Sequence, residues 1–273
     1  MNLLKLVRTT LTAAGLLIAA NGALCADEVP HVTAPVIATF SLRSDSVTLG
    51  EPVWIDYVVR NTTADSVTIQ LGHNRKANFR IVVTPPDRRS IETPRLSSEG
   101  MGLIGRVLIP AAHTYRQELL LDEWYDVDAP GQYEIAIGLG DEAPQVLRLQ
   151  VLERDPVKLE AVAKALHNQA LSPDVETADR AALALSSIDD PIAVPFLANL
   201  LSRKQPLAAR GLGRIGTPEA IDALLANLPE PHIAVHSAVR AELMMLRDTV
   251  SDPVMRRRID AALEGDRRVG VKQ

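Results

Sequence analysis

The chain has 273 residues and a formal net charge of −5. A mildly acidic chain in which aromatic residues make up 3% lacks the basic surface that phosphate backbones require, so we do not expect nucleic-acid binding. The length is sufficient for two domains of roughly 110–120 residues, each burying about two-thirds of its unfolded surface.

Residues 1–26 have the features of a signal peptide. Lys5 and Arg8 give a basic start, an apolar run of about ten residues follows at 11–20, and small side chains precede the cleavage point. The run is shorter than the roughly 20 residues that cross a bilayer, which favours cleavage over a permanent anchor. We therefore expect an exported protein, periplasmic or else extracellular, that begins with a flexible stretch at 27–34. Without Lys5 and Arg8 of the signal segment, the formal charge of the expected mature chain is −7, from 27 basic and 34 acidic residues.

The single cysteine, Cys25, lies inside this signal segment. The mature chain therefore has no disulfide, cysteine nucleophile or cysteine metal ligand. Lipidation of Cys25 is an open alternative, although Leu24 stands where a bacterial lipobox has a small residue. No later segment is apolar enough to span a membrane, so we expect a soluble mature protein.

Residues 35–154 alternate apolar and polar side chains with the period of two that is typical of β-strands. Val53, Ile55, Tyr57 and Val59 share one face of the clearest run, with polar side chains opposite. Runs of the same kind occur at 67–71, 79–83, 133–139 and 147–151. Seven or eight short strands with one apolar face predict a β-sandwich.

Two motifs in this region carry a family resemblance. Leu49-Gly50-Glu51-Pro52-Val53 leads into a strand that ends at Asn61, and Pro130-Gly131-Gln132-Tyr133 brings a tyrosine into a late strand. On these motifs the region resembles the immunoglobulin-like sandwiches of bacterial exported proteins. The resemblance implies a corner in which the tyrosine hydroxyl bonds nearby backbone. The order of these elements along the chain is also similar to that of proteinase inhibitors of the BsuPI type. This resemblance implies an alternative function as a protease inhibitor. The irregular loop expected at 85–101 is the most suitable inhibitory segment.

From residue 155 to 264 the apolar residues recur every three or four positions, the period of helices. Thr217-Pro218-Glu219 predicts a helix start, because a capping hydroxyl precedes a proline and an acid in the first turn. Asp190-Pro191 and Asp252-Pro253 have the same pattern. We expect second helices of successive units at 191–201, 218–228 and 252–263. A disordered basic tail is expected at 265–273.

The helical region repeats itself at a shift of 27 residues. The matching pairs are Ala181/Ala208, Ala182/Ala209, Leu185/Leu212, Ile188/Ile215, Pro191/Pro218, Ala193/Ala220, Val194/Ile221 and Leu197/Leu224. Such a period indicates stacked helical units. On residues 208–221, where Gly211 and Gly213 allow close helix contact, the region resembles the HEAT-like repeats of bilin lyases. A degenerate third unit is expected at 236–263. The predicted fold class is multidomain, an all-β immunoglobulin-like sandwich followed by an all-α, short HEAT-like α-solenoid.

The resemblance to HEAT-like repeats implies a non-enzymatic binding or scaffolding protein whose partner is another protein. In such arrays the second helices line a groove. The expected partner-binding residues are the polar ones on these helices: Asn199, Glu219, Asp222, Asn227 and Arg256. The enzyme alternative is a lyase-like or hydrolase-like activity, which would need a pocket between the domains lined by titratable groups.

Other chemical patterns do not support a catalytic, cofactor or metal site. His232 and His236 are four residues apart, but neither is followed by the glutamate that HEAT-like iron enzymes use. The acidic segment at 122–128 lacks the spacing of known calcium loops, so a solvated loop is expected. Trp124 and Tyr125 within it are expected to cover the sandwich core, with a contact role as the alternative. A Gly-x-Ser-x-Gly elbow is absent.

Overall fold

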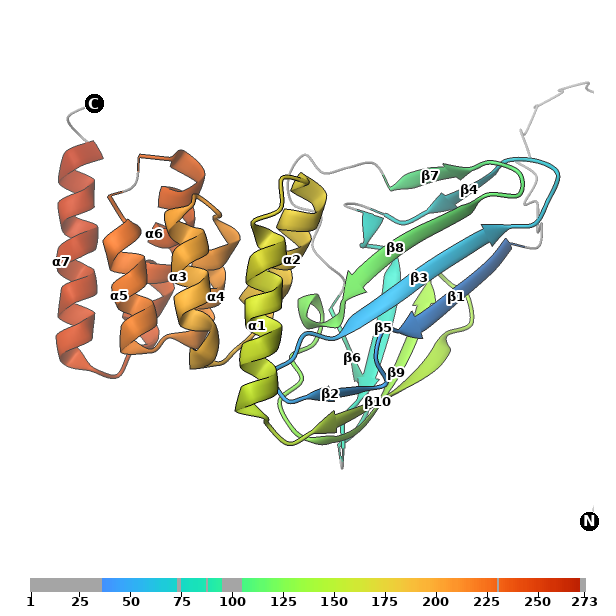
Figure 1. Ribbon diagram of the computed structural model, residues 1–273, viewed down its shortest axis with the longest axis horizontal. Helices are drawn as coiled ribbons and strands as arrows, with labels where there is room; N and C mark the ends of the chain where they lie inside the picture. The colour runs from blue at the N-terminus through green and yellow to red at the C-terminus, as the bar shows by residue number, and fades with distance from the viewer. Residues whose placement is uncertain (1–35, 73–74, 87, 95–104, 230, 271–273) are drawn as a thin grey trace, which may run out of the picture. The chain divides into compact units, whose positions relative to one another are not determined.

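A computed structural model of the protein describes most of the chain (Figure 1). The described residues are 36–72, 75–86, 88–94, 105–229 and 231–270. The expected signal peptide and the stretch at 27–34 lie outside them. Residues 35–273 form one compact unit. Within it the last strand ends at Leu152 and the first α-helix begins at Pro156, so the chain changes from β to α between these residues.

The described β region contains ten strands. In chain order they are β1 (Val36–Leu42), β2 (Ser46–Thr48), β3 (Trp54–Asn61), β4 (Val67–Gln70), β5 (Phe79–Thr84), β6 (Ile91–Glu92), β7 (Arg106–Ile109), β8 (Thr114–Leu120), β9 (Gly131–Leu139) and β10 (Gln145–Leu152). They form sheets of order β1-β3-β8, β2-β10-β9-β5-β6 and β4-β7. β2 pairs with β10 in parallel, and the remaining pairs are antiparallel.

The two larger sheets share one hydrophobic core. The alternation in β3 buries Ile55, Tyr57 and Val59, as the pattern predicts. The ring of Tyr57 stacks at 4.7 Å on Phe40 of the neighbouring strand β1, and across the two sheets it meets the edge of Phe79 of β5 at 5.1 Å. Aromatic pairs of this kind contribute about 0.5–1.5 kcal/mol beyond the area that they bury, so these rings join the two layers.

The hydroxyl of Tyr133 forms the backbone contact that the sequence predicts. It donates to the carbonyl oxygen of Ala129 at 2.9 Å and lies 3.3 Å from the Ala129 amide nitrogen, which donates to it. The side chain of Tyr133 is fully buried. Because an unsatisfied buried hydroxyl costs about 1–3 kcal/mol, this contact holds the turn before β9 against the core.

The helical region has seven α-helices and a 3-10 turn among the described residues. They are α1 (Pro156–Ala170), α2 (Val175–Ser187), η3 (Pro191–Ala193), α3 (Val194–Ser202), α4 (Leu207–Ile215), α5 (Pro218–Asn227), α6 (Ile233–Thr249) and α7 (Pro253–Gly270). The predicted caps are confirmed: Asp190, Thr217 and Asp252 accept hydrogen bonds from the amides of Ile192, Ala220 and Val254. Gly216 is left-handed and ends α4.

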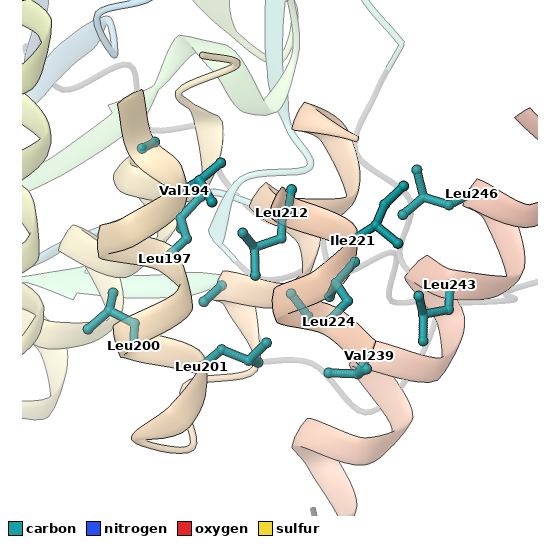
Figure 2. Packing of buried hydrophobic residues seen from close by; sticks show 14 of the residues in the cluster. Val194, Leu197, Leu200, Leu201, Leu212, Ile221, Leu224, Val239, Leu243 and Leu246 are labelled. Atoms are coloured by element: carbon teal, nitrogen blue, oxygen red, sulfur yellow. The ribbon is translucent and has the colours of Figure 1, made fainter. Parts of the chain in front are cut away.

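The helices pack in two rows, α1-α3-α5-α7 and α2-α4-α6 (Figure 1). Side chains from both rows meet in one core, to which α3, α4, α5 and α6 contribute (Figure 2). Leu185 and Leu212, one period apart, are both fully buried, and so are Leu197 and Leu224. The 27-residue period therefore places equivalent apolar side chains in successive units.

Close helix contact depends on two glycines of α4. A Cβ atom on Gly211 would lie 2.9 Å from the Cα of Ser186 in α2 and 2.9 Å from a methyl group of Leu197. A Cβ atom on Gly213 would overlap the carboxylate of Glu242 in α6. The expectation that small residues let these helices approach is confirmed.

Two expected irregular segments are partly regular. α7 continues to Gly270, so residues 265–270 are helical where the expected tail was disordered, and 271–273 lie outside the described residues. This added turn is held against α6, because the Asp266 carboxylate accepts hydrogen bonds from His236 at 2.8 Å and from Arg240 at 2.6 Å. In the segment at 85–101, β6 pairs with β5, while residues 87 and 95–101 are not described.

Candidate functional site

The expected partner-binding residues lie on one row of helices. Asn199 is on α3, Glu219, Asp222 and Asn227 are on α5, and Arg256 is on α7. Asn227 is half-buried and the others are exposed. Since α3 contacts α5 and α5 contacts α7, these helices form one row, whose exposed side we call the α3-α5-α7 face. Arg256 lies to the side of it, beside Arg247 and Asp248 of α6.

Several of these side chains already have partners within the chain. Asp222 pairs with Arg258 of α7 at 2.8 Å. The amide oxygen of Asn199 accepts from Arg203 at 3.2 Å, and the amide nitrogen of Asn227 donates to the carbonyl oxygen of Ala223 at 2.8 Å. The face is therefore polar and ordered, but the five residues do not converge on a common pocket.

A pocket with a volume of about 1080 Å³ lies beside the other row. One wall is the sheet β1-β3-β8, and the opposite wall is α2 with the segment that leads into α4. The titratable side chains that line it are Arg43, Asp56, Tyr57, Arg75, Lys76, Tyr115, Arg116, Glu118, Glu123, Glu176, Asp179, Arg180 and Lys204. None of the five expected contact residues is in this lining.

A shared carboxylate connects the two walls of this pocket. Glu118 of β8 forms ion pairs with Arg43, which follows β1, and with Arg180 of α2. Arg43 also reaches Asp56 at 3.4 Å, and its guanidinium lies 5.0 Å above the ring of Trp54. Each exposed ion pair contributes about 0.2–1 kcal/mol, but a network with one common acceptor also fixes the side-chain geometry.

Polar contacts order the rest of the lining. The Tyr115 hydroxyl donates to Gln117 at 2.9 Å, and Gln117 donates to the carbonyl oxygen of Arg75 at 2.9 Å. Burial raises the pKa of Tyr115, which keeps its hydroxyl protonated as a donor. Lys76 pairs with Glu123 at 2.5 Å. These contacts preorganise the pocket for a polar ligand.

Sequence reasoning missed the residues of this pocket. The alternation of β3 does place Asp56 on the face opposite Ile55 and Tyr57, which was a signal for a polar outer face. It did not indicate that Glu118 and Arg180, which are 62 residues apart, would face each other.

The remaining candidates have structural roles in the described chain. His236 pairs with Asp266 at 2.8 Å, and the described residues contain no cluster of three or more potential metal ligands. Trp124 is buried in the core and Tyr125 packs beside it, as expected. No described helix combines the length and the apolarity that crossing a membrane requires.

The acidic segment is more structured than the expected solvated loop. Asp122 lies in the short helix η2 (Leu121–Glu123), is half-buried, and accepts from the amide of Val53 at 3.0 Å. Burial raises the pKa of Asp122 to about 7. Asp126 pairs with Arg214 of α4 at 3.0 Å, so the segment also contacts the helices.

Residues 159–246 match the HEAT repeat family. The matched stretch begins in α1 and ends in α6, so it covers the helical core and not the sheets. The helical region therefore contains HEAT repeats within this stretch. No curated protein matches the chain.

Solved structures overlap this chain only in part. A β-glucosidase from Listeria innocua in complex with glucose is 14% identical, with 43% of this chain and 16% of that chain covered and a TM-score of 0.28. Spo0M, a sporulation control protein from Bacillus subtilis, is 16% identical, with 49% of this chain and 55% of that chain covered and a TM-score of 0.26. The Pseudomonas fluorescens alkylpurine DNA glycosylase AlkC, bound to DNA containing an abasic site analog, is 9% identical. The match covers 44% of this chain and 32% of that chain, with a TM-score of 0.25. The chain thus spans less than two-thirds of each, and overlaps this weak carry no argument about function.

Proposed function

We propose that this chain is an exported, non-enzymatic scaffold that binds another protein through its HEAT repeats. The observation that carries the proposal is the row of stacked helices α3, α5 and α7, which carries exposed polar side chains. Asn199, Glu219 and Asp222 are exposed on α3 and α5, and Asp222 pairs with Arg258 of α7. Stacked repeats of this kind typically offer an extended surface to one partner.

The β region is proposed to be an immunoglobulin-like sandwich that serves as a structural platform. The Tyr133 contact with Ala129 and the aromatic core shared by two sheets support this proposal. Export, with the periplasm as destination, is supported by the basic start and short apolar run of residues 1–26. Finding mature protein that starts at Asp27 in a periplasmic fraction would test that part.

A binding role suits the large pocket better than the lyase-like or hydrolase-like alternative. Among the described residues, the lining includes no His, Ser, Thr or Cys. The carboxylates of Glu118 and Glu123 are both held by cations of the chain. Side chains fixed by ion pairs in this way are suited to orienting a bound ligand.

Charge reversal on α5 tests the proposed contact face. Asp222→Arg combined with Asn227→Arg changes the face and also replaces the ion pair with Arg258 by a repulsion. Partners crosslinked to the wild-type protein in the periplasm should be lost from this double variant. Asp141→Arg, at an exposed turn of the β region, is the matched control and should retain them. If the double variant retains every partner, the α3-α5-α7 face is not the binding surface.

A further inference from the structure

The strand β8 has an open edge. In the sheet order β1-β3-β8 it has β3 as its neighbour, and no other described strand pairs with it. At the two ends of this pairing, Leu121 donates to Val53 at 2.9 Å and Asn61 donates to His113 at 3.0 Å. In an antiparallel ladder, alternate residues of a strand form their main-chain hydrogen bonds with the same neighbour. The odd-numbered residues of β8 therefore direct their N–H and C=O groups toward β3.

The even-numbered residues of β8 consequently direct their N–H and C=O groups to the opposite side. Arg116 and Glu118 are the central ones. Both also line the pocket of about 1080 Å³, with α2 as the opposite wall. A row of main-chain donors and acceptors thus borders a pocket that slightly exceeds the roughly 300–1,000 Å³ of small-molecule sites.

We propose that this edge binds an extended peptide segment of a partner protein as an additional antiparallel strand. In this mode main-chain hydrogen bonds supply affinity and side-chain pockets supply specificity. The edge is preorganised because Arg43 and Arg180 hold the side chain of Glu118 from both walls. Preorganisation lowers the ordering cost of binding. Charged side chains at Arg116 and Glu118 also discourage uncontrolled pairing between copies of the sheet.

The opposite wall indicates the side-chain chemistry of the peptide. Glu176 and Asp179 of α2 are exposed and line the pocket opposite β8. They favour lysine or arginine at a position of the added strand that faces α2. This surface does not include the α3-α5-α7 face, so the two proposals can fail independently.

Selection of linear nonapeptides from a random library against the full chain tests the proposal. We expect enriched peptides with a basic residue. N-methylation of alternate residues in such a peptide should weaken binding at least tenfold in one register and little in the other, because alternate amides of the added strand face β8. Equal effects of the two registers, or failure to enrich any peptide, would overturn the proposal.

Variants of the protein locate the site. Arg116→Pro removes one outward N–H and keeps the bonds to β3, since proline is tolerated on edge strands. It should weaken peptide binding at least tenfold more than Arg116→Ala, which removes the side chain alone. If Asp222→Arg abolishes peptide binding and Arg116→Pro does not, the peptide binds the helical face and this proposal is wrong.

Discussion

The guanidinium of Arg154 binds both carboxylate oxygens of Asp190, with Nε 2.5 Å from Oδ2 and Nη2 3.0 Å from Oδ1. Arg154 lies two residues after the end of β10, and Asp190 is the buried cap of η3. This bidentate pair therefore fastens the end of the β region to the start of a HEAT helix. A second link is close by, where Thr48 of β2 accepts from the amide of Asp155 at 2.8 Å.

Asp190→Ala should destabilise the protein by about 2–4 kcal/mol, because it removes a helix cap and leaves Arg154 without its partner. Urea unfolding followed by circular dichroism measures the change. Asp189→Ala, at the exposed neighbouring position, should change the free energy of unfolding by less than about 0.5 kcal/mol. Equal effects of the two variants would contradict the role of the Asp190 pair.

The stabilisation by Asp190 should depend on pH. Arg154 lowers the pKa of Asp190 below its ordinary value of 3.8. A carboxyl whose pKa is lower in the folded state stabilises the protein above its unfolded pKa, and this stabilisation is lost as pH falls through the folded pKa. The gap in unfolding free energy between wild type and Asp190→Ala should therefore narrow below about pH 4. A constant gap down to pH 2 would show that the ion pair contributes little.

Asp122→Asn should stabilise the protein at neutral pH. Burial raises the folded pKa of Asp122 to about 7, so its stabilising effect is complete below the unfolded pKa and is lost as pH rises through 7. Asparagine has the same shape, accepts the Val53 bond and carries no charge. We expect a gain of about 1–3 kcal/mol at pH 8 and little gain at pH 4, measured by thermal or urea unfolding. Asp126→Asn, which is exposed, is the control and should show no comparable gain.

Gly211→Ala should destabilise the helical array by about 1–3 kcal/mol, because the new methyl group would meet the backbone of Ser186 at 2.9 Å. Gly265→Ala in α7 is a matched control, since nothing lies within 4 Å of its Cβ position. There, alanine should stabilise by about 0.5–1 kcal/mol through helix propensity. Thermal unfolding of the two variants should shift in opposite directions, and shifts of the same sign would refute the packing role of Gly211.

Tyr133→Phe should cost about 1–2 kcal/mol, because the buried ring stays while the bonds to Ala129 are lost. Tyr125→Phe changes a neighbouring ring that is only partly buried, and should cost less than about 0.5 kcal/mol. Equilibrium unfolding in urea distinguishes the two. A neutral Tyr133→Phe would show that the corner does not stabilise the β region.

Short-range features of this protein could be predicted from sequence because each is encoded within a few residues. The alternation at residues 53–59 defines the buried face of β3, and the cap at Thr217 defines the start of α5. The 27-residue period identifies the repeats, since equivalent side chains such as Leu185 and Leu212 fill the same place in successive units. These patterns depend on local geometry, which is the same whatever lies nearby.

The tertiary structure alone decided which distant groups meet. Glu118 and Arg180 are separated by 62 residues, and Arg154 and Asp190 by 36, so no local period relates them. The extension of α7 likewise depends on His236 and Arg240 of α6, which hold Asp266. The pocket beside β8 arises because sheet and helix packing bring their polar faces together. Side-chain periodicity specifies which residues face outward, whereas the packing of whole elements determines what those residues face.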